Sequence, residues 1–73
     1  MVEIGNMSQI GEMVRRERKA QRVNQIQLAQ LANVGVRFVR DIEDGKESVH
    51  TGKLLQVLDT LGIALTFSLP SGE

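Results

Sequence analysis

The sequence predicts a small, mainly α-helical domain that closes with a single β-strand. Three observations carry this prediction: four segments place apolar residues at helical spacing, Asn or Gly residues stand at the breaks, and the last segment alternates in period two. The helical segments predict four to five helices, and a chain of 73 residues is long enough for one domain. Because the chain has no Cys, we expect packing rather than disulfides to stabilise it.

The first predicted helix runs from about Ser8, whose hydroxyl is placed to cap it, to about Gln21. Its inward residues at helical spacing are Ile10, Met13 and Val14. We expect residues 1–7 to form a tail before it and residues 8–62 to form the helix-turn-helix domain.

Residues 24–46 predict two short helices joined by a three-residue turn. Asn24 is placed to cap the first of these helices, and Asp44-Gly45 closes the second. The turn is Asn33-Val34-Gly35, in which Asn and Gly tolerate left-handed backbone angles. The expected inward residues are Ile26, Leu28, Ala29 and Ala32 in the first helix and Val36, Val39 and Ile42 in the second.

An ordinary helical hairpin would show the same turn, so the outer face of the second helix decides the interpretation. Arg37 and Arg40 fall on the side away from its apolar stripe. A helix that reads DNA needs donors for base edges and phosphates at those positions. The segment therefore predicts a helix-turn-helix that binds double-stranded DNA.

A fourth helix is predicted from about Thr51 to Leu61, and Gly62 ends it. Its apolar face holds Leu54, Leu55, Val57, Leu58 and Leu61. Apolar residues then occupy every second position until Pro70, namely Ile63, Leu65, Phe67 and Leu69.

A single strand in a helical domain leaves its backbone groups without a partner. We expect residues 63–69 to pair with the same strand of a second copy around a two-fold axis, giving a homodimer, with residues 70–73 as a tail. The alternative is a segment that lies extended along its own domain, or a tail whose alternation is coincidental.

Formal net charge is zero, but the charges are segregated along the chain. From Arg15 to Arg40 there are seven basic residues against the single acid Glu17, a local balance of +6, and the remainder carries −6. This distribution predicts one positive face suited to a phosphate backbone and one acidic face. A solvated surface stripe is the alternative for the basic run of the first helix.

Particular residues of the helix-turn-helix segment match a known family pattern. They are Val23, Asn24, Gln25, Leu28, Ala29, Val34, Val39, Ile42, Glu43, Asp44, Gly45 and Lys46. This pattern resembles the lambda-repressor-like, or Xre/Cro, helix-turn-helix family. With Arg37-Phe38-Val39, the run from Lys53 to Gly62 and the closing strand included, the chain looks like the HipB type of antitoxin.

The resemblance implies a lambda-repressor-like fold and a homodimer with an intermolecular C-terminal sheet. It also implies binding to inverted-repeat operators at its own promoter and to a HipA-like kinase toxin, which it would hold inactive. Two departures from the family are Arg22, where a helix-ending Gly is common, and Gly35, where Ser or Thr usually caps the recognition helix.

The same resemblance assigns roles in DNA binding to individual residues. Val36, Arg37 and Phe38 match base-reading positions, and Arg37 is able to make a bidentate contact to guanine. Arg40, one turn later, would serve a phosphate or a base. Phe38 has the alternative of a partly buried packing role.

The remaining assignments concern the DNA backbone and one ion pair. Asn24 and Gln25 would lie against a phosphate at a helix N-terminus, and Gln25 also reaches a base edge. The alternative for Asn24 is a capping role alone. Lys46 matches a backbone-contacting lysine. Arg18 and Glu43 match a structural ion pair between the first and third helices, and Arg18 would also present an edge to a phosphate.

Other classes of protein have little support in the sequence. His50 is the one His, no Gly-rich phosphate loop exists, and we expect no catalysis, cofactor or metal, with His50 a surface residue or a cap. No apolar run approaches roughly 20 residues and residues 1–9 do not resemble a signal peptide, so we expect a cytoplasmic protein without a membrane partner.

Three functions therefore compete. The first is a repressor that is also the antitoxin of a HipAB-like pair and regulates its own operon. The second is an autonomous Xre-type repressor with no toxin. The third is a protein–protein adaptor that uses this scaffold without touching DNA.

Overall fold

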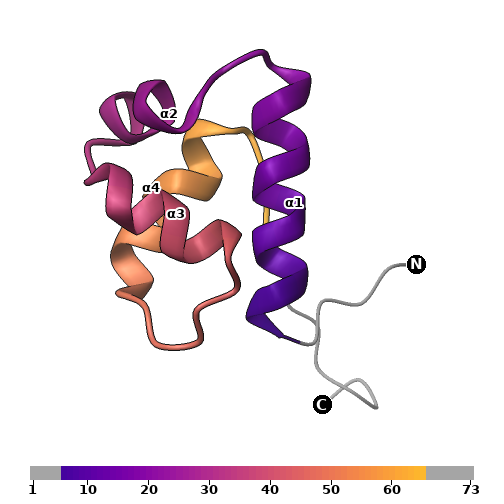
Figure 1. The fold of residues 1–73 in the computed structure, drawn as a ribbon, viewed down its shortest axis with the longest axis vertical. Helices are drawn as coiled ribbons and strands as arrows, with labels where there is room; N and C mark the ends of the chain where they lie inside the picture. The colour runs from indigo at the N-terminus through magenta and orange to yellow at the C-terminus, as the bar shows by residue number, and fades with distance from the viewer. Residues whose placement is uncertain (1–5, 66–73) are drawn as a thin grey trace.

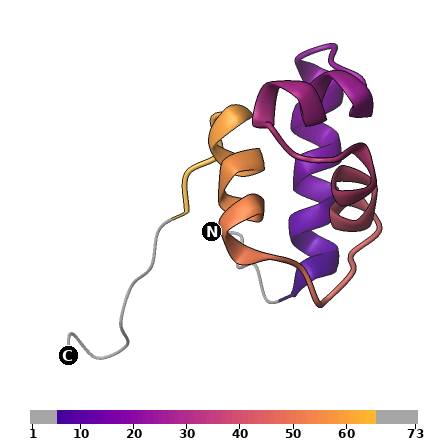
Figure 2. The ribbon, with the colours of Figure 1, turned by 90° about the vertical axis from the view of Figure 1, so that its left-hand side faces the viewer.

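The computed structural model describes residues 6–65, which form four helices (Figure 1). These are α1 (Met7–Ala20), α2 (Gln25–Ala32), α3 (Val36–Glu43) and α4 (Thr51–Thr60). α1 runs along one side with the other helices grouped against it, and the perpendicular view places α3 and α4 on opposite flanks (Figure 2). Among the described residues, no helix has the length and apolar character needed to cross a membrane.

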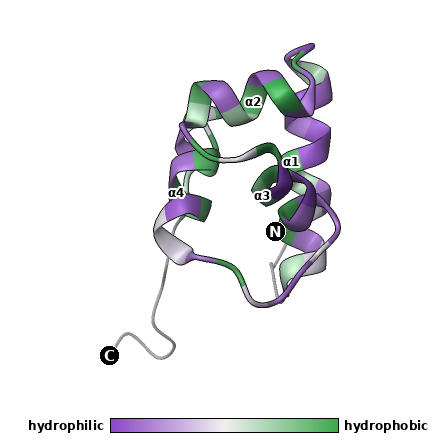
Figure 3. Ribbon diagram, turned by 60° about the vertical axis from the view of Figure 1, so that its left-hand side comes forward, coloured by the Kyte–Doolittle hydropathy of each residue, from purple (hydrophilic) through white to green (hydrophobic). Residues whose placement is uncertain are grey.

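The helices enclose one aliphatic core. Its buried members are Val14, Leu28, Ala29, Ala32, Val39, Ile42, Leu54, Val57, Leu58 and Leu61. Figure 3 shows the hydrophobic stretches of α3 and α4 facing the centre of the bundle. α3 packs against both α1 and α2, and α2 packs against α4, so the predicted helix-turn-helix is held from two sides.

Two residues expected to point inward are exposed instead. Ile26 is 56% exposed and Leu55 is 48% exposed. Ile26 lies about 200° around the helix from Leu28, so a buried stripe through Leu28 leaves it outside. Leu55 is displaced by about 100° from Leu54 in the same way. Ile10 and Met13 are only half-buried.

Side-chain caps start three of the helices. The prediction that Ser8 caps α1 is wrong: the cap is Asn6, whose Oδ1 accepts a hydrogen bond from the Gln9 backbone N–H at 3.0 Å. Asn24 caps α2 as expected, accepting from the Gln27 N–H at 2.7 Å while Gln27 returns a bond to the Asn24 N–H at 2.9 Å. His50 caps α4 through Nδ1. These caps fix where the chain enters each helix.

All four helices end in the same backbone reversal, in which an N–H bonds the carbonyl five residues earlier. The bonds are Val23 to Arg18 at 3.1 Å, Val34 to Ala29 at 2.9 Å, Lys46 to Asp41 at 2.9 Å and Ile63 to Leu58 at 2.8 Å. The residue before each donor is left-handed: Arg22, Asn33, Gly45 and Gly62. Gly35 was expected to share this role but is extended, with φ −76°, so Asn33 alone turns the chain between α2 and α3.

Arg22 adopts φ 59°, which costs a residue with a Cβ more than it costs Gly. We therefore expect Arg22→Gly to raise the free energy of unfolding by about 0.5–1 kcal/mol. Arg16→Gly is the matched control, because it makes the same change inside α1 and should lower stability by about 1 kcal/mol. Urea unfolding of both variants checks this, and a less stable Arg22→Gly would contradict it.

The backbones of α1 and α3 come close together at Gly11. A Cβ at this position would overlap the backbone carbonyl oxygen of Ile42 and lie 3.0 Å from that of Glu43. We expect Gly11→Ala to lower the free energy of unfolding by roughly 1–3 kcal/mol, because two packed backbones must separate. Gly52→Ala is the control, since its Cβ meets no backbone atom of another helix and only the exposed ring of His50, 3.1 Å away; that ring caps α4, but the higher helix propensity of Ala offsets a small shift of it, so stability in thermal unfolding should change by less than about 0.5 kcal/mol. Equal effects of the two changes would contradict the packing argument.

The predicted terminal strand is described only in its first three residues. Ile63 packs partly against the core and Leu65 is 38% exposed, and residues 63–65 are not in a strand. Phe67 and Leu69 lie outside the described residues. The prediction of a helical domain is confirmed with four helices, whereas the strand and its pairing stay predictions.

Candidate nucleic-acid interface

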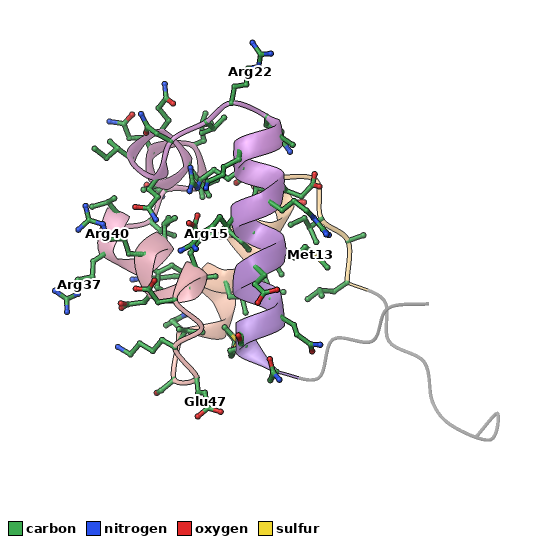
Figure 4. The ribbon with its side chains drawn as sticks, turned by 45° about the vertical axis from the view of Figure 1, so that its right-hand side comes forward. Met13, Arg15, Arg22, Arg37, Arg40 and Glu47 are labelled. Carbon is green, nitrogen blue, oxygen red and sulfur yellow. The ribbon has the colours of Figure 1, made fainter. Side chains whose placement is uncertain are left out.

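The outer face of α3 carries two arginines on a rigid support. Arg37 and Arg40 are exposed, while Val39 and Ile42 on the opposite face are fully buried. Figure 4 shows both arginines extending from α3 on the side away from α1. In the described part of the chain, the Arg37 guanidinium has no hydrogen bond or ion pair, so all its donors face solvent. This face can offer guanidinium groups to an acceptor-rich surface.

The start of α2 lies directly beside this face of α3. Gln25, the first residue of α2, is half-buried, and its Nε2 donates to Glu43 Oε1 at 3.1 Å. Its Oε1 accepts a hydrogen bond from Arg40 Nε at 3.4 Å. The structure therefore brings Gln25 and Arg40 together, two residues that the sequence places in separate helices.

A buried carboxylate joins three helices beneath the site. Glu43 is 6% exposed. Arg18 donates two hydrogen bonds to its carboxylate, from Nε to Oε2 at 2.6 Å and from Nη2 to Oε1 at 3.0 Å. Arg15 Nε adds a third guanidinium contact at 3.3 Å. This carboxylate ties α3 to both α1 and α2, because it only accepts hydrogen bonds and its donors come from Arg15 and Arg18 on α1 and from Gln25 on α2.

The additional phosphate contact expected for Arg18 does not fit this geometry. Arg18 is 9% exposed, and its Nη1 donates to the Val23 backbone carbonyl at 3.0 Å while its other nitrogens hold Glu43. The Arg18 guanidinium therefore uses its nitrogens within the protein and is not available to a phosphate. Sequence reasoning missed Arg15 as a partner of Glu43, although its position one turn before Arg18 was a usable indication.

Burial raises the pKa of Glu43, but hydrogen bonds from Arg18, Gln25 and Arg15 outweigh burial and hold the pKa below its ordinary value of 4.5. The native state therefore binds fewer protons than the unfolded chain in acid. The resulting stability is present above the unfolded pKa and is lost as pH falls through the lower folded pKa.

We expect the free energy of unfolding, measured in urea from about pH 7 to about pH 3, to decline below about pH 4.5 in the native protein. Glu43→Gln should remove most of that dependence, since the buried side chain at position 43 then no longer titrates. Glu12→Gln, at an exposed position on α1, should keep it. If the free energy of unfolding depends on pH in the same way in all three proteins, Glu43 is not the source of that dependence.

The other residues expected to contact DNA differ in how far they are exposed. Val36 and Phe38 are half-buried and pack against the core, so the packing role foreseen for Phe38 is present. Asn24 is exposed, but its Oδ1 is used in capping. Lys46 is exposed just beyond α3 and pairs with Asp41 at 3.6 Å.

The residues of the basic run do not all lie on the outer side of α3. Arg18 is buried, Arg15 bonds Glu43 and approaches Asp44 at 3.8 Å, and Arg22 points away at the turn after α1 (Figure 4). The positive charge on the outer side of α3 therefore comes from Arg37 and Arg40.

Two short helices at a tight turn, with arginines on the outer face of the second, define a helix-turn-helix protein. The chain is 48% identical over 61 residues to y4mF of Sinorhizobium fredii (strain NBRC 101917 / NGR234), an uncharacterized HTH-type transcriptional regulator. That match covers 84% of this chain and 80% of the relative. The protein belongs to the HTH-type transcriptional regulators. No family model matches the chain.

Solved structures show the same fold. A chain from the structure of a HipA-HipB-O2-O3 complex superposes with a TM-score of 0.85, covering 97% of this chain and 100% of that one at 14% identity. A chain from a HipB-O4 20mer complex superposes with a TM-score of 0.84 at the same identity and coverage. The HipB-type fold expected from the sequence is confirmed.

Proposed function

We propose that this protein is a sequence-specific DNA-binding transcriptional repressor that reads the major groove with α3. The observation that carries the proposal is the pair Arg37 and Arg40, exposed on the outer face of a short helix whose inward residues Val39 and Ile42 are fully buried. A B-DNA major groove admits one α-helix, and Arg is the side chain that most often reads guanine there. Membership of the HTH-type transcriptional regulators supports the same function.

Each residue of the interface has a distinct task in this proposal. Arg37 contacts guanine O6 and N7, and Val36 touches a thymine methyl group beside it. Asn24 and Gln25 bring the N-terminus of α2 against a phosphate, where exposed N–H groups favour an anion. Lys46 contacts the backbone on the far side of α3, exchanging Asp41 for a phosphate.

We further propose that the protein acts as a homodimer on an inverted repeat. Leu55 and Leu65 are exposed large apolar residues at and beyond α4, and a 73-residue chain gains stability by sharing such surface with a second copy. Pairing of residues 63–69 across the two-fold axis, through Ile63, Leu65, Phe67 and Leu69, would cover it. The two copies of α3 would then lie about 34–36 Å apart, one helical turn of DNA.

A selection of bound duplexes from a random-sequence pool tests the DNA-binding function. We expect an inverted repeat with a guanine in each half-site and half-site centres about 10–10.5 base pairs apart. Affinity for the selected duplex should fall steeply between about 50 and 200 mM salt, because phosphate contacts release counterions. No enrichment and no salt-dependent binding would favour the adaptor function instead.

The finer role that we propose is that of an antitoxin that represses its own operon and neutralises a HipA-like kinase in the cytoplasm. Its support is the fold shared with a chain from a HipA-HipB complex. Co-expression with the product of a neighbouring kinase-like reading frame tests this role: we expect the two proteins to copurify and the kinase to lose activity. A gene with no such neighbour, or a kinase left fully active, would leave an autonomous repressor.

A further inference from the structure

Gln25 lies at the junction between the buried carboxylate of Glu43 and the exposed guanidinium of Arg40. Its side-chain amide contacts both groups at once, through Nε2 at 3.1 Å and Oε1 at 3.4 Å. Two helices meet here: Gln25 begins α2, and Arg40 and Glu43 lie one turn apart on α3.

The orientation of the Gln25 amide is determined by Glu43. An ionised carboxylate only accepts hydrogen bonds, so the NH₂ end of the amide must face Glu43 and the carbonyl oxygen must face outward. Arg18 and Arg15 donate hydrogen bonds to both oxygens of Glu43, so its carboxylate cannot rotate to suit a Gln25 amide turned the other way. Gln25 therefore presents a fixed acceptor beside α3.

That acceptor takes the Nε of Arg40 and leaves the two terminal nitrogens of the guanidinium unused within the described residues. A guanidinium held at Nε still offers a pair of parallel donors, the arrangement that matches guanine O6 and N7. Arg37 has no such restraint. The two arginines of α3 thus differ: one is oriented before any ligand arrives, and the other is free to adjust.

We propose that Gln25 is a positioning residue that sets Arg40 as a second guanine-reading group, with its own amide oriented by Glu43. This proposal rests on the proposed DNA-binding function. Prior orientation lowers the side-chain entropy lost on binding, so the effect is on affinity and on preference at one base pair. Gln25 acts on the DNA through Arg40 rather than by reading a base itself.

A double-mutant cycle on the full-length protein tests the proposal. Binding to the selected operator is measured by fluorescence anisotropy for the native protein, Gln25→Ala, Arg40→Ala and the combination. We expect the combined loss of affinity to be smaller than the product of the two single losses by at least about threefold, because both changes remove the same interaction. The cycle of Gln25→Ala with Arg37→Ala should be multiplicative within about twofold.

A second measurement separates positioning from a merely structural role. Each base pair of the operator is changed in turn, and we expect Gln25→Ala and Arg40→Ala to lose preference at the same pair while the pair read by Arg37 keeps its preference. Arg40→Lys, which keeps the charge but lacks the donor fork, should lose that preference too. Gln30→Ala, an exposed Gln on α2, is the control and should change nothing.

The outcomes distinguish this proposal from the function on which it rests. If the native protein selects no DNA sequence, the proposed function fails. If it binds selectively but the Gln25–Arg40 cycle is multiplicative, or Gln25→Ala weakens all operator variants equally, the function stands and the positioning role is overturned. Thermal unfolding of each variant confirms that every assay is run on folded protein.

Discussion

Arg37→Ala should lower affinity for the operator by roughly 30-fold or more while leaving the fold intact. A bidentate contact to guanine discriminates against other bases by about 1–3 kcal/mol, and a homodimer on an inverted repeat makes two such contacts. Arg37 is exposed and makes no hydrogen bond or ion pair within the described residues, so its removal should have little effect on stability. Fluorescence anisotropy on the selected duplex measures the loss, and circular dichroism reports the fold.

Arg16→Ala is the matched control for this change. Arg16 is also exposed, but it lies on α1, on the side of that helix opposite the buried Val14. Both variants remove one positive charge per protomer, so a purely electrostatic interaction would weaken about equally in the two. Equal losses would contradict base reading by Arg37, whereas a large loss confined to Arg37→Ala supports it.

Glu43→Ala should be the most destabilising single change at the site, lowering the free energy of unfolding by roughly 3–5 kcal/mol. The change leaves the Arg18 guanidinium buried without its carboxylate, and it also removes the acceptor for Gln25 and Arg15. Urea unfolding at neutral pH measures this loss. α3 would lose its fixed orientation in the same variant, so DNA binding should fall with it.

Glu12→Ala removes a carboxylate from an exposed position and is expected to change stability by less than about 0.5 kcal/mol. The double change Arg18→Met with Glu43→Leu should recover most of the stability lost in Glu43→Ala, because no charge is then left unpaired in the interior. A Glu43→Ala protein as stable as the Glu12→Ala control would show that the ion pair does not hold the helices together.

Helical spacing and helix-end residues were sufficient to predict the four helices. Asn24 and Gly62 were read correctly because capping and helix termination depend on a few neighbouring residues. The first cap was assigned to Ser8 instead of Asn6, since both residue types accept hydrogen bonds and spacing alone does not choose between them. Ile26 was placed inward because its type suggested burial that its angle around α2 does not allow.

The site was predictable where it depends on exposed positions of one helix, as for Arg37 and Arg40. Apart from the Arg18–Glu43 ion pair, which the family resemblance implied, it was not predictable where it depends on contacts between helices. The Gln25–Arg40 contact and the share of Arg15 in holding Glu43 require knowing how α1, α2 and α3 cross. The close approach of α1 and α3 at Gly11 was not predictable either, because nothing in the sequence around Gly11 indicates that the backbone of α3 lies against it.

The most direct test of the central claim is a mobility shift of the purified protein on the DNA upstream of its own gene, against random-sequence DNA of the same length. We predict selective binding by the native protein at moderate salt, retained in Arg16→Ala and lost in Arg37→Ala. Equal binding to both DNAs, or no binding even at low salt, would contradict a repressor that reads its operator with α3.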